Sequence, residues 1–177
     1  MNTSTTAQEG VSIQDMMFCR DRRVQLQEQL LQNHGTPLIS FCMNIPGPVK
    51  TDTLIRRAFD QGTAEIEKAL SAHPDWQILS RHEIHEKTGD ELMLSVTADA
   101  QALKDVMSQI EETHPLGRLF DIDIIGTDGR KLSRPRYRSC LLCGRQAQEC
   151  ASSRRHSAAE LFARIQEMLS AYFNAKN

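Results

Sequence analysis

The stretch His114-Pro-Leu-Gly-Arg-Leu-Phe-Asp-Ile-Asp-Ile-Ile125 carries the strongest structural signal in this chain. Its second half alternates apolar and acidic residues, which is the pattern of a β-strand with one buried face. The phenylalanine and the alternate isoleucines would pack against helices, while Asp121 and Asp123 share the open face of the sheet. We therefore expect a central strand over residues 119–125 that presents two carboxylates side by side.

Helix and strand patterns follow one another in a regular order on both sides of this strand, and capping and turn residues separate them. The predicted elements are a polar helix over 12–33, a strand over 38–45, a helix from Asp52 to about residue 70, a hairpin of 76–84 and 91–96, a helix over 99–113, and a short return strand near 131–133. Together with the strand over 119–125 they give a βαββαβ core, the ferredoxin-like arrangement of the α+β class. We expect two helices on one face of its antiparallel sheet and an open second face.

The sequence predicts a single domain. Residues 1–10 are polar and are expected to be disordered. Residues 11–177 would form the domain, with an N-terminal helix (11–35), the α+β core (37–134) and a basic segment with three cysteines (135–177). A capping box at Ser157 predicts that this last segment ends in a helix.

Composition places the chain among ordinary globular proteins. It has 177 residues, of which 40% are hydrophobic and 25% charged. Five cysteines are an odd number, so a fully paired disulfide framework is excluded. No secretory signal and no apolar run near the roughly 18 residues of a membrane span is present. We expect a cytoplasmic protein with reduced thiols and no membrane contact.

The net charge of −2 hides an uneven distribution. Residues 130–156 contain eight basic residues and one acidic residue, which gives this segment +7 and the other 150 residues −9. A basic block of this kind commonly meets nucleic acid, a polyphosphate ligand or an acidic protein. A solvated surface segment is the plain alternative.

Asp121 and Asp123 are candidate Mg²⁺ ligands. Adjacent carboxylates repel each other, and a hard divalent cation relieves that repulsion. Mg²⁺ held there would bridge polyphosphate oxygens and offset charge on a leaving diphosphate. The alternative is that both are exposed strand residues without a function.

Candidate phosphate ligands lie nearer the N-terminus. The loop Asn44-Ile-Pro-Gly-Pro-Val-Lys50 leads into a helix, where Gly47 permits close backbone approach and Lys50 adds a positive charge. Guanidinium groups on the first two helices, among them Arg20, Arg23 and Arg56, suit bidentate phosphate binding. The alternatives are a rigid turn and solvated surface arginines.

The spacing Cys140-x₂-Cys143-x₆-Cys150-x₅-His156 resembles a zinc knuckle with four ligands. Three buried or idle thiols are the alternative. Cys19 and Cys42 lie in a predicted helix and strand and are expected to pack in the core. His114, beside the aspartate motif, is either a general base or a histidine that fixes its loop by a hydrogen bond.

These residues together resemble the apo-citrate lyase phosphoribosyl-dephospho-CoA transferase family, the holo-acyl carrier protein synthases of citrate lyase. The resemblance spans roughly residues 11–170. It rests on Arg20-Asp21-x-Arg23, on Pro46-Gly-Pro-x-Lys50, on Cys140-Leu-Leu-Cys143 with Cys150 and His156, and above all on His114-Pro-Leu-Gly-Arg-Leu-x-Asp-x-Asp123.

The resemblance implies a transferase with a nucleotidyltransferase-like reaction. A serine of the citrate lyase acyl carrier protein (the gamma subunit) would attack 2′-(5″-triphosphoribosyl)-3′-dephospho-CoA, and diphosphate would leave. Asp121 and Asp123 would hold Mg²⁺, and Arg118, after Gly117, would contact the triphosphate together with Lys50. The basic segment would dock the carrier.

Two other classes remain open. One is a zinc-bearing nucleic-acid-binding module without enzymatic activity, although aromatic residues make up only 5% of the chain and no stacking pair accompanies the arginines. The other is a ligand-sensing ferredoxin-like domain, which gives no reason for two carboxylates on an open sheet face. We expect no nucleic acid partner.

Overall fold

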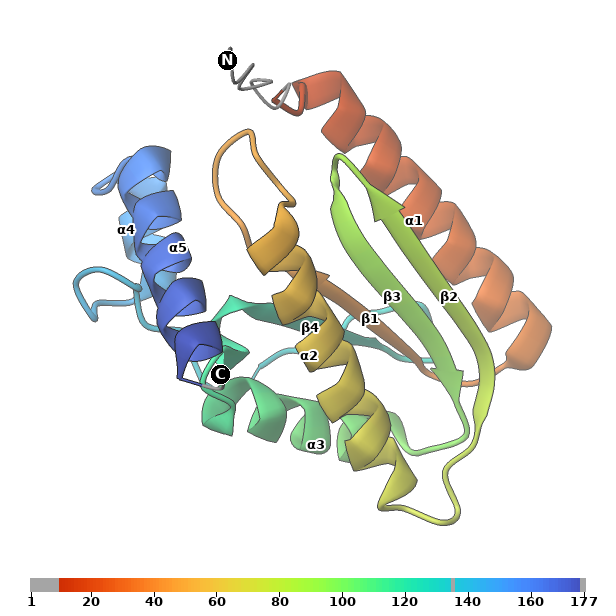
Figure 1. The fold of residues 1–177 in the computed structure, drawn as a ribbon. Coiled ribbons are helices and arrows are strands. Elements are labelled where there is room, and N and C mark those ends of the chain that lie inside the picture. The colour runs from red at the N-terminus through yellow and green to blue at the C-terminus, as the bar shows by residue number, and fades with distance from the viewer. Residues whose placement is uncertain (1–9, 135, 176–177) are drawn as a thin grey trace, which may run out of the picture.

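The computed structural model describes residues 10–134 and 136–175 (Figure 1). Four strands form one antiparallel sheet in the order β2-β3-β1-β4. Their bounds are β1 (Leu38–Met43), β2 (Ile78–Glu86), β3 (Gly89–Val96) and β4 (Phe120–Ile125). The expectation that the aspartate strand is central is wrong, because β4 pairs with β1 as its one neighbouring strand in the described sheet and forms an edge of it.

The four long helices begin where capping residues predict. They are α1 (Ile13–His34), α2 (Thr53–Ser71), α3 (Ala100–Thr113), the 3₁₀ turn η1 (Gly117–Leu119), α4 (Ala147–Ser152) and α5 (Ala158–Asn174). Asp52 and Asp99 accept hydrogen bonds from the first turns of α2 and α3. Ser12 and Ser157 form reciprocal capping boxes with Asp15 and Glu160. Each cap satisfies backbone N–H groups that the helix itself leaves unpaired.

The core lies between one face of the sheet and helices α2, α3 and α5 (Figure 1). Phe41 of β1 stacks on Phe59 of α2, with ring centroids 5.0 Å apart, and meets the edge of Phe120 of β4 at 5.5 Å. Ile122 and Ile124 are fully buried on the same face, as the alternation of β4 requires. This packing places the strand's carboxylates on the opposite face.

The second face of the sheet is not open over its whole width. Helix α1 packs there, and its Leu30 contacts Leu38, Met93 and Ile125 in a small separate apolar cluster. The expected uncovered face is therefore wrong for this part of the sheet. The physical reason is that α1, although mostly polar, carries enough apolar residues on one side to bury this cluster. Asp121 and Asp123 keep 40% and 24% of their side chains exposed.

The return strand is reduced to a single bridge between Ile125 and Lys131, with the Leu132 N–H donating to the Ile124 carbonyl at 2.9 Å. Among the helices that the structure describes, none has both the length and the apolarity to cross a membrane. Residues 1–9, for which disorder is predicted, lie outside the described part of the chain.

Gly62 on α2 gives a test of the core. A Cβ atom at this position would overlap the Phe41 ring, which cannot swing away because it is stacked on Phe59. We expect Gly62→Ala to lower the free energy of unfolding by about 1–3 kcal/mol through overpacking, despite the better helix propensity of alanine. Urea denaturation would measure it. Lys68→Ala, at an exposed position of the same helix, should change it by less than about 0.5 kcal/mol. Equal stability of the Gly62→Ala variant and the wild type would contradict this packing.

Candidate functional site

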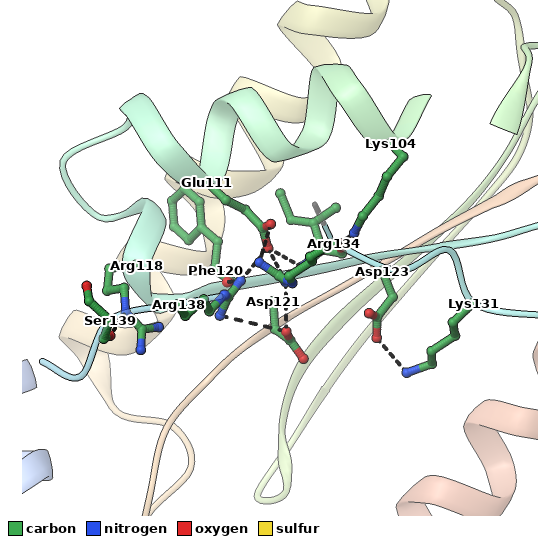
Figure 2. A network of polar contacts seen from close by, with 11 residues as sticks. Lys104, Glu111, Arg118, Phe120, Asp121, Asp123, Lys131, Arg134, Arg138 and Ser139 are labelled. Atoms are coloured by element: carbon green, nitrogen blue, oxygen red, sulfur yellow. Dashed lines mark hydrogen bonds and ion pairs between the residues drawn. The ribbon is translucent and has the colours of Figure 1, made fainter. Parts of the chain in front are cut away.

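A buried carboxylate lies at the centre of the site. Glu111, near the end of α3, keeps 4% of its side chain exposed. One of its oxygens accepts the backbone N–H of Ile122 at 2.9 Å and a guanidinium N–H from each of Arg134 and Arg138. The other accepts a second N–H of Arg134 at 2.6 Å. Figure 2 shows both arginines converging on this carboxylate.

These contacts close the free edge of the sheet. The outer edge of β4 would otherwise expose unpaired backbone groups. The Ile122 N–H donates to Glu111, the Ile122 carbonyl accepts from the Lys104 ammonium at 3.4 Å, and the Phe120 carbonyl accepts from Arg138. Side chains thus take the place of a fifth strand along Phe120 and Ile122, and they fix the segment with Arg134 and Arg138 against β4.

Asp121 and Asp123 point to the same face of β4 (Figure 2). They lie opposite Cys42 and Ser40 of β1. Asp121 forms an ion pair with Arg134 at 3.3 Å and lies 3.8 Å from Arg138, while Asp123 pairs with Lys131 at 2.5 Å. Both carboxylates therefore have cationic partners supplied by residues 131–138.

This donor set suits Mg²⁺. Proteins commonly hold Mg²⁺ with one or two carboxylates together with water and substrate phosphates, and two partly exposed aspartates on one strand face supply such oxygens. The lysine and arginine partners are themselves exposed or half-buried, so they can exchange for a metal ion and substrate.

The segment that carries Arg134, Arg136 and Arg138 lies between two cavities. One, of about 460 Å³, opens toward the end of α3 and is also lined by Arg118. The other, of about 680 Å³, is lined by Asp123 and Lys131 on its far side. The same arginines therefore border both the aspartate face and the α3 side of β4.

Arg118 and Gly117 lie in η1, beside the first cavity. The Arg118 Nε donates to the Ser139 carbonyl at 2.7 Å, and its Nη1 is buried with no hydrogen-bond partner among the described residues. A Cβ atom at Gly117 would lie within 2.7 Å of the carbonyl oxygens of Glu111 and Ile110. Glycine at this position therefore permits the close packing of η1 on α3.

The predicted phosphate ligands fall into two groups. Arg23 donates two hydrogen bonds, of 2.6 and 3.2 Å, to Glu91 of β3, and Arg56 forms an ion pair with the fully buried Asp90 at 2.5 Å. Burial would raise the pKa of Glu91, but its bonds to Arg23 outweigh that effect and lower the pKa. Both arginines are thus engaged by carboxylates of the sheet.

Arg20, Gly47 and Lys50 form the other group, around a cavity of about 280 Å³ near the start of α1. Gly47 has a φ of +83°, which favours glycine. The Lys50 ammonium donates to the Ile45 carbonyl at 2.7 Å, and burial together with the charge of Arg20 lowers the pKa of Lys50. The structure brings these three residues together, but they border a different cavity from Arg118.

The cysteine segment folds into a compact cluster. The ligand atoms of Cys140, Cys143, Cys150 and His156 all lie within 4.8 Å of one another and could hold a metal ion. The Cys143 sulfur lies 3.5 Å from that of Cys150 and 3.3 Å from the His156 Nε2. Burial disfavours the Cys140 thiolate, but hydrogen bonds from the backbone of Leu142 and Cys143 and from the neighbouring thiols lower its pKa overall.

His114 fixes its own loop. Its Nδ1 accepts the backbone N–H of Leu116 at 3.0 Å, and its ring stacks on Phe120. Of the two roles left open for this residue, the structure supports the local hydrogen bond.

Sequence reasoning missed Glu111. A signal was present, because Glu111 continues the buried row of Leu103 and Met107 at a spacing of four residues. A charged residue on the apolar side of a helix predicts a buried partner of opposite charge. Nothing in the sequence indicates that this partner lies more than 20 residues further on, at Arg134 and Arg138.

Comparison with known proteins supports one family. A family model described as apo-citrate lyase phosphoribosyl-dephospho-CoA transferase matches residues 11–172. The chain is 39% identical to the apo-citrate lyase phosphoribosyl-dephospho-CoA transferase of Escherichia coli O139:H28 over 164 aligned residues. The alignment covers 90% of this chain and 89% of that protein. The protein of the same name from Shigella boydii serotype 18 is 38% identical over the same shares of both chains.

Removal of the Glu111 carboxylate tests whether it holds α3, β4 and the arginine segment together. We expect Glu111→Ala to lower the free energy of unfolding by roughly 3–5 kcal/mol, because it removes the buried carboxylate that neutralises two guanidinium groups and accepts the Ile122 N–H. Chemical denaturation followed by circular dichroism would measure the change. The neighbouring Glu112→Ala, at an exposed position, should lower it by less than about 0.5 kcal/mol. Similar losses in both variants would contradict the role assigned to Glu111.

Proposed function

Because the chain belongs to the apo-citrate lyase phosphoribosyl-dephospho-CoA transferase family and is an enzyme of the transferase class, we propose that it completes the citrate lyase acyl carrier protein. The donor is 2′-(5″-triphosphoribosyl)-3′-dephospho-CoA. The hydroxyl oxygen of a carrier serine forms a bond to the phosphorus nearest the ribose. The bond from that phosphorus to the outer two phosphates breaks, diphosphate leaves, and the serine proton passes to solvent or a base.

The observation that carries this proposal is the position of the two carboxylates of β4 beside an arginine-rich segment. Asp123 borders the same cavity as Arg134 and Arg138, and Asp121 touches both arginines. Phosphoryl transfer requires mainly positioning and charge stabilisation. Carboxylates for a metal ion and guanidinium groups for phosphate oxygens supply both.

We assign Asp121 and Asp123 as the residues that hold Mg²⁺. When bound, Mg²⁺ would neutralise charge that builds up on the departing diphosphate. Arg118 is proposed to contact the triphosphate, whereas Lys50, for which the same role was predicted, borders a separate cavity with Arg20 and Gly47. Arg134 and Lys131 would keep the two carboxylates paired when substrate is absent.

The exposed arginines of the basic segment are proposed to dock the carrier. Arg145, Arg154 and Arg155 are exposed, whereas Arg138 is half-buried and bound to Glu111. Charges on the surface can steer an acidic partner, whereas a guanidinium group already paired inside the fold cannot.

We propose that the cluster of Cys140, Cys143, Cys150 and His156 is a structural zinc site. Three sulfurs and one imidazole nitrogen are a closed tetrahedral ligand set. Such a site needs reduced thiols, which supports the cytoplasm as the compartment.

The sheet order β2-β3-β1-β4, with helices between β1 and β2 and between β3 and β4, supports the ferredoxin-like assignment.

The transferase proposal is tested by the intact mass of apo-carrier incubated with this protein, Mg²⁺ and the donor. We expect the carrier to gain the mass of the phosphoribosyl-dephospho-CoA group. Asp121→Asn and Asp123→Asn should each lower the rate at least about 100-fold, because the lost carboxylate removes a ligand of the metal ion. Asp105→Asn, at an exposed position of α3, is the matched control and should retain the rate.

Near-normal rates for both β4 variants would show that the assignment of the aspartates is wrong. An unmodified carrier, together with a salt-dependent shift of RNA or DNA by this protein, would instead favour the nucleic-acid-binding alternative.

Zinc is tested separately by metal analysis of the purified protein. We expect about one zinc per chain, and its loss in Cys143→Ser together with a lower melting temperature, because a structural zinc contributes directly to folding. Cys42→Ser removes a thiol outside the cluster and should leave the zinc content unchanged. Zinc-free wild-type protein with the same melting temperature after chelation would contradict the proposal.

A further inference from the structure

The cavity of about 460 Å³ beside α3 has an unusual lining. Arg118 from η1 and three arginines of the following segment face it, together with two glutamates, Glu111 and Glu112. The four guanidinium groups exceed the carboxylates by two charges. Its volume lies within the roughly 300–1,000 Å³ of small-ligand sites. An excess of positive charge in a bounded cavity favours a small anion.

The arginines of this cavity differ in how far their charges are already neutralised. Arg134 and Arg138 are bound to Glu111, which fixes their position on the cavity wall (Figure 2). Arg136 is exposed and has no ion pair among the described residues. The Arg118 Nη1 also has no hydrogen-bond partner within the described part of the chain. Two guanidinium groups held by Glu111 and two with unused N–H donors among the described residues therefore surround one space.

Like charges crowd together here. Burial lowers the pKa of Arg118, and the positive charges of Arg138 and Arg134 lower it further. Burial also lowers the pKa of Arg138, although Glu111 opposes that effect. An anion with several oxygens would relieve this repulsion and give each planar guanidinium group an acceptor.

We propose that this cavity is a polyphosphate site, formed by Arg118, Arg134, Arg136 and Arg138 and held in shape by Glu111. It lies on the α3 side of β4, across the arginine segment from the cavity of Asp123. The inference rests on the proposed function for its role. There, the outer two phosphates of the donor occupy the site, and the diphosphate remains bound in it after its bond to the inner phosphorus breaks.

Glu111 is a positioning residue in this assignment. Its negative charge disfavours direct contact with phosphate, but it holds Arg134 by two hydrogen bonds and Arg138 by one. Arg134 also reaches Asp121, so it links the polyphosphate site to the aspartate face. The bond that breaks would therefore lie between the site of the leaving diphosphate and the carboxylates.

The test is direct binding of inorganic diphosphate to the full chain, measured by isothermal titration calorimetry without donor or carrier. Arg136→Gln is the informative variant, because Arg136 has no ion-pair partner among the described residues and its loss should not disturb the fold. We expect its Kd for diphosphate to rise about 10-fold, with Arg136→Lys intermediate because lysine keeps the charge but loses the planar fork. The matched control Arg130→Gln removes an exposed arginine of the same basic segment outside the cavity and should leave the Kd within about twofold.

Glu111→Gln supplies a second measurement. It keeps the shape of the side chain but removes the charge that fixes Arg134 and Arg138, so we expect weaker diphosphate binding. Its transfer reaction should show a raised KM for the donor with an unchanged KM for the carrier. A purely structural role would lower the amount of active protein and leave both KM values alone.

The outcomes separate the two proposals. Wild-type affinity for diphosphate in Arg136→Gln, or equal weakening in Arg130→Gln, would overturn the polyphosphate site while carrier modification by the wild-type protein still stood. Diphosphate binding that depends on Arg136, in a protein that does not modify the carrier, would support the site and reject the proposed reaction.

Discussion

The Glu111 carboxylate is the contact on which the arrangement of this protein's site depends. It joins α3, the edge strand β4 and the segment of Arg134 and Arg138. A carboxylate buried to this degree is strongly unfavourable alone and becomes tolerable only with charged partners and full hydrogen bonding. Because each partner lies in a different part of the chain, the pairing specifies one packing of these parts and disfavours others.

Strand β4 consequently has three distinct surfaces. Its apolar face packs in the core through Phe120, Ile122 and Ile124. Its outer edge is closed by side chains at Phe120 and Ile122 and by the backbone of Leu132 at Ile124, which pairs backbone groups that could otherwise bond to another chain. Its other face presents Asp121 and Asp123 to residues 131–138. An edge position is what makes this possible, because a central strand would have a neighbour where the arginine segment now lies.

Arginines in this protein either form structural ion pairs or line a cavity, and residue type alone does not predict which. Arg23 and Arg56 meet Glu91 and Asp90, both buried on β3, and act as ties between helices and sheet. Arg134 and Arg138, which follow β4, share Glu111, and the four arginines that line the adjacent cavity outnumber its two glutamates. The balance of charge within a few ångströms therefore separates a structural ion pair from a site ready for an anion.

The sequence by itself determined the features that depend on near neighbours. The capping residues set where α1, α2, α3 and α5 begin, and the alternation of β4 set which of its residues are buried, because both rest on contacts within a few positions along the chain. The spacing of the cysteines likewise predicted their cluster. Only the tertiary structure decided that β4 is an edge strand, that α1 covers part of the second face, and that Glu111 selects Arg134 and Arg138. Each of these outcomes depends on which distant segment pairs with a strand edge, covers an apolar patch or neutralises a buried charge. The sequence offers residues of the same type at several other positions, so residue type alone does not identify the partner.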